Sequence, residues 1–216
     1  MQTRAERFLT PEEQKKINQC VHDAEKQTSG EIVPMVVSES HSYPLAPIIG
    51  ATFITLPTAL LAARVIGSHF WIGPDNMWLF LVCFICIFIP AFHTIKRVFW
   101  LKRLFLLPKR ADEEVREAAL GVFFTEKLYK TKAENGILLY ISVFERRVWI
   151  LADAGINQRV PHEHWLEIVD LVTEGIKNHR QCDAICEAIA RIGTMLKDVF
   201  PIEQDDVNEL HNLIIK

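Results

Sequence analysis

Two carboxylates stand at the ends of apolar runs that are typical of β-strands. Glu31 opens the run EIVPMVV, and Asp153 directly follows the run VWILA. If the first strand begins where the last one ends, both carboxylates lie at one rim of a sheet. There they could bind a hard cation such as Ca²⁺ or Mg²⁺ through oxygen ligands. The alternative is that Glu31 is a solvated strand end and that Asp153 caps the turn at Ala154 and Gly155, a common role of Asp before Gly.

A second group of polar residues follows the strands at the opposite rim. Ligands of open α/β sheets usually bind at the carboxyl ends of the strands. We therefore treat Ser38, Ser142, Glu145 and Arg146 as candidate ligand-binding residues. Arg146 could hold a phosphate or a carboxylate group. The alternative is that these residues form an ordinary solvated hairpin turn.

Diagnostic catalytic signatures do not occur in the sequence. The run His162-Glu163-His164 lacks the H-E-x-x-H spacing, and residues two apart on a helix point to different faces. The chain also lacks the G-x-S-x-G motif, the Gly-rich phosphate loop and the dinucleotide fingerprint. Whether the protein is an enzyme stays open. If it is one, Glu31 and Asp153 favour a metal-dependent, phosphatase-like hydrolase in which the ion orients water.

The five cysteines are odd in number and scattered along the chain. This pattern predicts reduced, mostly structural thiols. Cys182 and Cys186 lie one helical turn apart and could share a metal, but no second pair of ligands has the spacing to complete such a site.

Helical and strand patterns alternate outside two long apolar segments. We expect strands over 31–37, 136–144 and 148–152, with helices over 10–27, 111–130, 161–178 and 181–200 and a short last helix capped at 205–206. A right-handed crossover makes the first two strands parallel, and the short turn makes the third antiparallel to the second. Pro34 lacks a backbone donor and predicts an edge position or a bulge. The pattern predicts a layered α/β domain with a mixed, mostly buried sheet.

The two apolar segments, Leu45–Ala63 and Met77–Phe92, are each close to the length that crosses a bilayer. A short polar turn joins them, which predicts a transmembrane helical hairpin. Buried helices in a soluble core are the alternative, but so small a domain has little interior to surround a helix that is apolar on all sides. We expect residues 1–43 and 108–216 to form one discontinuous soluble domain and residues 44–107 to form the hairpin with its basic segment.

Basic residues lie mainly at one end of the predicted hairpin. Arg64 stands alone near the turn, whereas Lys96, Arg97, Lys102, Arg103, Lys109 and Arg110 follow the second helix. The positive-inside rule then places both termini in the cytosol, in a two-pass protein of the inner (cytoplasmic) membrane. The first eight residues show no secretory signal pattern, which agrees with this orientation. The net charge of −3 is spread over the chain, so we expect no nucleic-acid partner.

Several short stretches resemble the TPM domain family, known from thylakoid-lumen proteins of photosystem II repair and from bacterial membrane proteins. The matching stretches are TSGEIV at 28–33, GILLYIS at 136–142 with ERRV at 145–148, ADAGI at 152–156, FP at 200–201 and NEL at 208–210. They span nearly all of the predicted soluble domain and omit the hairpin. The resemblance implies a three-layer α/β/α sandwich, here interrupted by the two-helix transmembrane hairpin.

The resemblance also implies two functions. One is the assembly or maintenance of a membrane protein complex, and the other is a weak metal-dependent phosphatase activity. The acidic positions in the matched stretches are Glu31, Glu145 and Asp153. We favour a membrane-anchored interaction module whose partners are the lipid bilayer and a membrane protein, with a homo-oligomer also open. The phosphatase-type hydrolase is the alternative.

Overall fold

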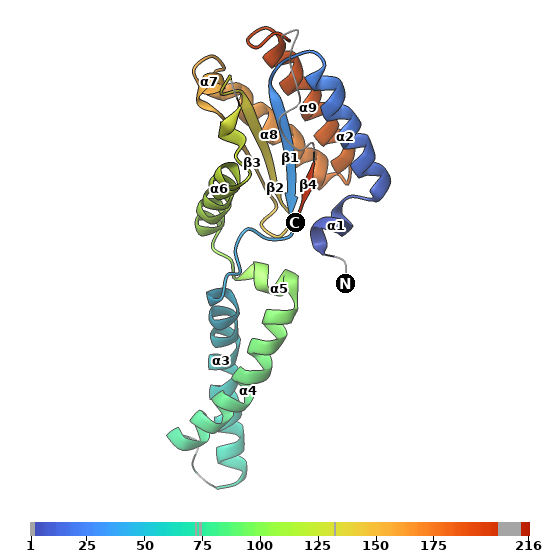
Figure 1. Cartoon of the computed structure of the whole chain (residues 1–216). Helices are drawn as coiled ribbons and strands as arrows, with labels where there is room; N and C mark the ends of the chain where they lie inside the picture. Colours follow the sequence, from blue (N-terminus) through green and yellow to red (C-terminus); the bar gives the residue numbers. More distant parts are fainter. Residues whose placement is uncertain (1–2, 72, 74, 132, 203–212) are drawn as a thin grey trace. The chain divides into compact units, whose positions relative to one another are not determined.

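The computed structural model describes residues 3–71, 73, 75–131, 133–202 and 213–216. The chain divides into two compact units, one made of Met1–His41 with Asp112–Lys216 and the other of Ser42–Ala111. Both units are shown in Figure 1.

The first unit is built on a four-stranded mixed sheet in the order β3-β2-β1-β4. Strand β1 (Glu31–Val37) runs parallel to β2 (Gly136–Ser142), with Glu31 opposite Gly136, and β3 (Arg147–Ala152) runs antiparallel to β2. Both pairings confirm the expected topology. Strand β4 (Ile214–Ile215), which pairs in parallel with Met35 and Val36, was not predicted.

Pro34 lies in β1, which is an inner strand rather than an edge strand. The backbone groups of Val36 and Ser38 face β4, as shown by the bonds of Val36 O and Ser38 N with Lys216. Pro34 lies two residues before Val36, so its backbone nitrogen also faces the β4 side of the strand. Within the described residues, strand β4 pairs only with Met35 and Val36. The position therefore needs no donor, which explains how the proline fits inside the sheet.

Helices cover both faces of this sheet (Figure 1). Apolar side chains of α2 (Pro11–Glu25), α8 (His162–Lys177) and α9 (Gln181–Lys197) form one core with Ile32, Val36 and the odd-numbered residues of β2. On the other face, α6 (Pro108–Thr125) and the 3₁₀ turn η1 (Leu128–Lys130) pack on the remaining positions of β1 and β2. The result is the expected three-layer α/β/α sandwich. Two short helices complete the unit, α1 (Arg4–Phe8) and α7 (Ala154–Asn157).

Helix α2 shows how local sequence sets the ends of these elements. The Thr10 hydroxyl accepts a hydrogen bond from Glu13 N, and the Glu13 carboxylate accepts one from Thr10 N, while Pro11 occupies the first helical position. This capping box satisfies two backbone donors that the helix itself leaves unbonded. The expected helix at 205–206 lies outside the described residues.

The second unit is a pair of long apolar helices. Helix α3 (Leu45–His69) and helix α4 (Met77–Arg97) have 25 and 21 residues and are long and apolar enough to span a membrane. They meet along a narrow seam that includes Ala59, Ala63 and Cys83. Only 11% of the most apolar stretch of α4 is buried, and large side chains such as Trp78 (79% exposed) point outward. A soluble core would bury such a helix, whereas lipid favours this exposure. The short helix α5 (Phe99–Leu104) follows α4.

Candidate functional site

The amino-end rim of the sheet, where β1 and β2 begin and β3 ends, carries both predicted carboxylates. Glu31 N donates to Asn135 O at 3.2 Å, and Asp153 N donates to Gly136 O at 2.9 Å. Glu31 and Asp153 therefore flank Gly136 on its two sides. Because Glu31 and Asp153 are two strand spacings apart, their Cα atoms lie about 9.5 Å from each other.

Gly136 leaves the space between these carboxylates open for a backbone carbonyl. A Cβ atom at Gly136 would overlap the carbonyl oxygen of Leu128, which belongs to η1. A Cβ at Gly155 would in turn lie only 2.8 Å from Glu134 O. Both glycines are thus required by the close approach of the segment that precedes β2, and this approach brings carbonyl oxygens to the rim.

Asp153 has one oxygen in use and one without a donor. Its Oδ1 accepts from Ala154 N at 2.7 Å, which is the turn-capping role given above as the alternative. Its Oδ2 is buried and has no hydrogen-bond partner among the described residues. A buried acceptor that is left unsatisfied is costly, so a bound ion or ordered water is the usual explanation.

Asn135 adds a second buried acceptor at this rim, and the sequence analysis missed it. Its side-chain nitrogen donates to Ser29 O, and its backbone nitrogen donates to the Thr131 hydroxyl at 3.0 Å. Its Oδ1 is buried with no donor in the described part of the chain. The sequence did hold a signal for this role. Asn135 is a polar residue directly before Gly136, which opens β2 at the same rim as Asp153.

The atoms at this rim that could bind a metal ion are all oxygens. Glu31 is 6% exposed and supplies a carboxylate, while Asp153 and Asn135 supply the unsatisfied oxygens. Within the described residues, no three His, Cys, Asp or Glu side chains cluster as metal ligands. A cation here would therefore need amide and backbone carbonyl oxygens besides the two carboxylates. Ca²⁺ accepts such a mixed oxygen set more readily than Mg²⁺ does.

The carboxyl-end rim, where β2 ends, holds a carboxylate whose two oxygens both have partners. Glu145 is 4% exposed, and its two oxygens accept from the Ser142 hydroxyl and from Ser40 N, the latter at 3.0 Å. The Ser40 hydroxyl lies 3.2 Å from the Tyr140 hydroxyl. Burial raises the pKa of Tyr140 above its ordinary value. These bonds join the end of β2 to the segment that follows β1.

Ser38 and Arg146, the other two candidates at this rim, adjoin the Ser142–Glu145 pair through the backbone, and Ser38 O accepts from Phe144 N at 3.1 Å. The Ser38 hydroxyl accepts from Ala5 N at 3.1 Å, and Ser38 N donates to Lys216 O at 2.9 Å. Ser38 thus joins α1 to the end of the chain. Arg146 lies in the turn between β2 and β3 with φ 53° and an exposed side chain.

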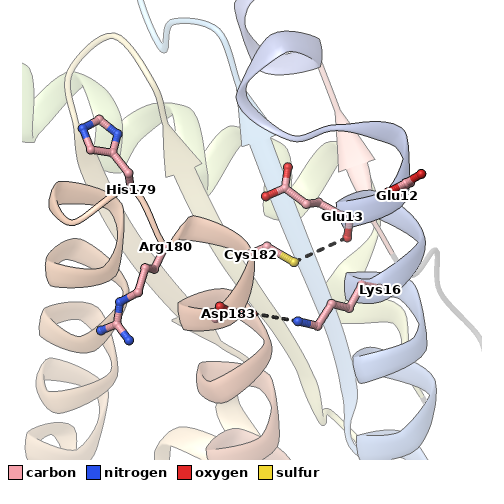
Figure 2. Close-up of a pocket in the computed structure, with 7 residues that line it drawn as sticks. All are labelled: Glu12, Glu13, Lys16, His179, Arg180, Cys182 and Asp183. Atoms are coloured by element: carbon pink, nitrogen blue, oxygen red, sulfur yellow. Dashed lines mark hydrogen bonds and ion pairs between the residues drawn. The ribbon is translucent and has the colours of Figure 1, made fainter.

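A cavity of about 320 Å³ lies between the start of α2 and the start of α9 (Figure 2), and no pattern in the sequence predicted it. Lys16 and Asp183 form an exposed ion pair across it at 2.7 Å. Their hydrogen bond raises the pKa of Lys16 and lowers that of Asp183. Cys182 lines the same cavity, with its sulfur 3.8 Å from Glu13 O, and burial raises the pKa of this thiol. The paired charges leave no strong net charge to attract a ligand.

The prediction of reduced thiols is wrong for two of the cysteines. Cys20 in α2 and Cys186 in α9 form a disulfide, with a Cα–Cα distance of 5.6 Å that lies within the usual range. They are 166 residues apart, so only the packing of α2 against α9 brings them together. Cys186 is therefore unavailable for the metal pair with Cys182. In α4, Cys83 and Cys86 have C-x-x-C spacing, but one is buried and the other is exposed.

Comparison with known proteins agrees with this architecture. Residues 97–195 match the TPM domain. A solved structure, the NMR structure of BA42 protein from the psychrophilic bacterium Bizionia argentinensis, is similar to the chain with a TM-score of 0.59 and 23% identity, covering 96% of this chain and 94% of that one. At this identity the likeness shows the shared fold. No curated protein matches the chain. The match over residues 97–195 and the sandwich fold together support the resemblance to the TPM domain family, and an apolar hairpin is inserted after the first strand.

Proposed function

We propose that this membrane-anchored TPM protein is an interaction module that binds a membrane protein or complex through its sandwich. The observation that carries the proposal is an exposed aromatic pair at the junction of α6 and η1. Phe124 is 59% exposed, Tyr129 is 41% exposed, and their ring centroids are 5.6 Å apart. Exposed aromatic residues are enriched at the energetic centres of protein interfaces. Anchoring also confines the sandwich near membrane partners, which raises their effective concentration.

Site-specific photo-crosslinking in native membranes tests this proposal. A photoreactive residue at Phe124 should give a discrete adduct with a membrane protein, and Tyr129→Ala should weaken that adduct. The matched control is Leu166 on α8, which is 53% exposed on the opposite side of the sheet and should give no such adduct. Failure to form an adduct at Phe124, or the same adduct from both positions, would exclude this surface as the docking site.

A second candidate function is hydrolysis of phosphate esters at the amino-end rim. The observation that favours it is the pair of buried, unsatisfied oxygens, Asp153 Oδ2 and Asn135 Oδ1, at the same rim of the sheet as Glu31. Asp153, Glu31 and Asn135 would hold a divalent cation, whose chemistry is to orient and activate water. The Ala154 N–H fixes the Asp153 carboxylate through its other oxygen, which orients the ligand.

The hydrolase proposal is tested on the purified full chain with a phosphate monoester, with and without Ca²⁺, Mg²⁺ or Mn²⁺. Asp153→Asn and Glu31→Gln should each abolish the cation-dependent rate. Asp183→Asn, which changes an exposed carboxylate far along the chain, should leave it unchanged. An unchanged rate in both rim variants would rule out the site.

We further propose that both termini are cytosolic, in a two-pass protein of the inner membrane. Six basic residues at the end of the second helix support this orientation. The Cys20–Cys186 disulfide opposes it, because disulfides persist mainly in oxidising compartments. Protease added to inverted vesicles should cleave the sandwich, and protease added to intact spheroplasts should not. The reverse pattern would place the sandwich on the oxidising side.

A further inference from the structure

One stretch of the second unit combines strong positive charge with exposed apolar side chains. From Asn76 to Ala111 the chain has no Asp or Glu. Within this stretch, six basic residues fall in fifteen positions: Lys96, Arg97, Lys102, Arg103, Lys109 and Arg110. We call residues 96–110 the basic juxtamembrane segment. No acid inside the segment offsets this charge.

The backbone of this segment leaves the direction of α4 at Val98. Val98 has φ −90° and ψ 103°, and its N–H donates to Thr94 O at 2.8 Å as α4 ends. Lys102 N donates to Val98 O at 3.0 Å as α5 begins. The middle of the segment therefore forms a separate short helix, α5, while Lys96 and Arg97 end α4 and Lys109 and Arg110 lie in the first turn of α6. Helix α5 directly follows the apolar span, which is the position of the headgroup region when α4 crosses a bilayer.

The apolar side chains of α5 are exposed on one face. Trp100 is 70% exposed and Leu104, one turn later, is 69% exposed, so both lie on the same side of the helix. Leu107 follows with 62% exposure. Lys102 Nζ also lies over the Tyr43 ring, 5.9 Å from its centroid, so a basic group and an aromatic face are neighbours here. Apolar anchors next to basic side chains are typical of helices that lie in a membrane interface.

We propose that the basic juxtamembrane segment binds the phosphate groups of anionic lipids, with Trp100 and Leu104 inserted at the level of the acyl-chain boundary. An acidic soluble partner would match the charge but would not account for bulky apolar residues that continue directly from a membrane span. This inference goes beyond docking of a protein partner and requires only that α3 and α4 are embedded.

Lipid selectivity of the reconstituted full chain tests this inference. The protein is placed in phosphatidylcholine vesicles with spin-labelled phosphatidylglycerol or spin-labelled phosphatidylcholine, and electron paramagnetic resonance measures the fraction of label that the protein immobilises. We expect phosphatidylglycerol to be preferred about fivefold at low salt, because each Lys or Arg at an anionic surface is attracted by about that factor. The preference should shrink at high ionic strength.

Two charge-matched variants locate the effect. In Lys102→Gln/Arg103→Gln/Lys109→Gln/Arg110→Gln the preference should fall, because only Lys96 and Arg97 of the six basic residues remain. The control removes four exposed basic residues of the sandwich, Lys15, Lys177, Arg180 and Lys197, and should keep the wild-type preference. Equal immobilisation of both lipids by wild type, or an unchanged preference in the first variant, would overturn the inference. Failure to immobilise either lipid would overturn the membrane anchor as well, so the two failures are distinguishable.

Discussion

The two rims of the sheet each carry a carboxylate just after a strand, but the two carboxylates differ in how many of their oxygens accept hydrogen bonds. At the carboxyl-end rim, Glu145 has both oxygens bonded by the chain itself, through Ser142 and Ser40. At the amino-end rim, Asp153 has one oxygen bonded by Ala154 and the other buried without a donor among the described residues. Both residues are carboxylates near the end of a strand, but the chain supplies hydrogen-bond donors to both oxygens of Glu145 and to only one oxygen of Asp153.

This difference separates a structural carboxylate from a candidate ligand. A buried carboxylate whose two oxygens both accept hydrogen bonds from the chain contributes to stability and is already engaged by the fold. A buried oxygen that the fold leaves unsatisfied keeps its capacity for an ion or a water molecule. The amino-end rim is therefore the better candidate for a functional site, and four measurements test this contrast.

Gly136→Ala should have the largest effect. The new methyl group would overlap the Leu128 carbonyl, and backbone on both sides must move, so the free energy of unfolding should fall by about 3 kcal/mol. Urea denaturation of the full chain in detergent, followed by near-ultraviolet circular dichroism, measures this change. The control is Gly121→Ala in α6, where a Cβ meets nothing within 4 Å and the same substitution should stabilise the helix slightly. Equal effects of the two substitutions would show that the carbonyl does not line the rim.

Glu145→Ala should cost about 2 kcal/mol of unfolding free energy. The substitution leaves the fully buried Ser142 hydroxyl and the Ser40 N–H without their acceptor. The same denaturation experiment reports the loss. Glu187→Ala, which breaks only an exposed ion pair with Arg191, should change stability by less than about 0.5 kcal/mol. If Glu145→Ala lowered the free energy of unfolding no more than this control, the hydrogen bonds of Glu145 with Ser142 and Ser40 would not stabilise the carboxyl-end rim.

Calcium should stabilise the wild-type protein and leave Asp153→Asn unaffected. At a Ca²⁺ concentration tenfold above Kd, binding to the folded state alone adds about 1.4 kcal/mol to the free energy of unfolding. Without cations the substitution should be nearly neutral, because asparagine can still cap Ala154 N while one buried charge is removed. Thermal unfolding with Ca²⁺ and with a chelator gives both comparisons. The same calcium response in wild type and variant would remove Asp153 from the ligand set.

Alkaline pH should weaken the carboxyl-end rim by the smallest amount. Burial raises the pKa of Tyr140, so the unfolded chain loses this proton at a lower pH than the folded one. The folded state then binds more protons, and its stability falls as pH rises from about 10, the ordinary tyrosine pKa. Unfolding measured from pH 9 to 11 should show a shallower decline in Tyr140→Phe than in wild type. Parallel declines would assign the alkaline loss to other groups.

Much of this arrangement follows from sequence patterns. The parallel crossover and the short turn after β2 fix the register, which places Glu31 and Asp153 at one rim. The capping box at Thr10 is likewise readable because it depends on neighbours three residues apart.

Other features depend on contacts that no local pattern reveals. The Asn135 side chain is held at the rim by its hydrogen bond to Ser29 O, and Ser29 is 106 residues away in sequence. Strand β4 has only two residues and exists through pairing with β1, so it has no periodicity of its own to read. The Cys20–Cys186 bridge requires the packing of α2 on α9, which spacing along the chain cannot show.

The insertion of the hairpin between β1 and β2 sets the order in which the sandwich can be completed during translation. Strand β1 ends at Val37, and its central partner begins roughly a hundred residues later at Gly136. At ordinary synthesis rates of about 5–20 residues per second, β1 waits for several seconds while the intervening apolar helices are synthesised. The strand is wholly buried in the finished protein, so its apolar side chains need shelter during this delay. The first strand therefore stays without its central partner until the second half of the domain emerges.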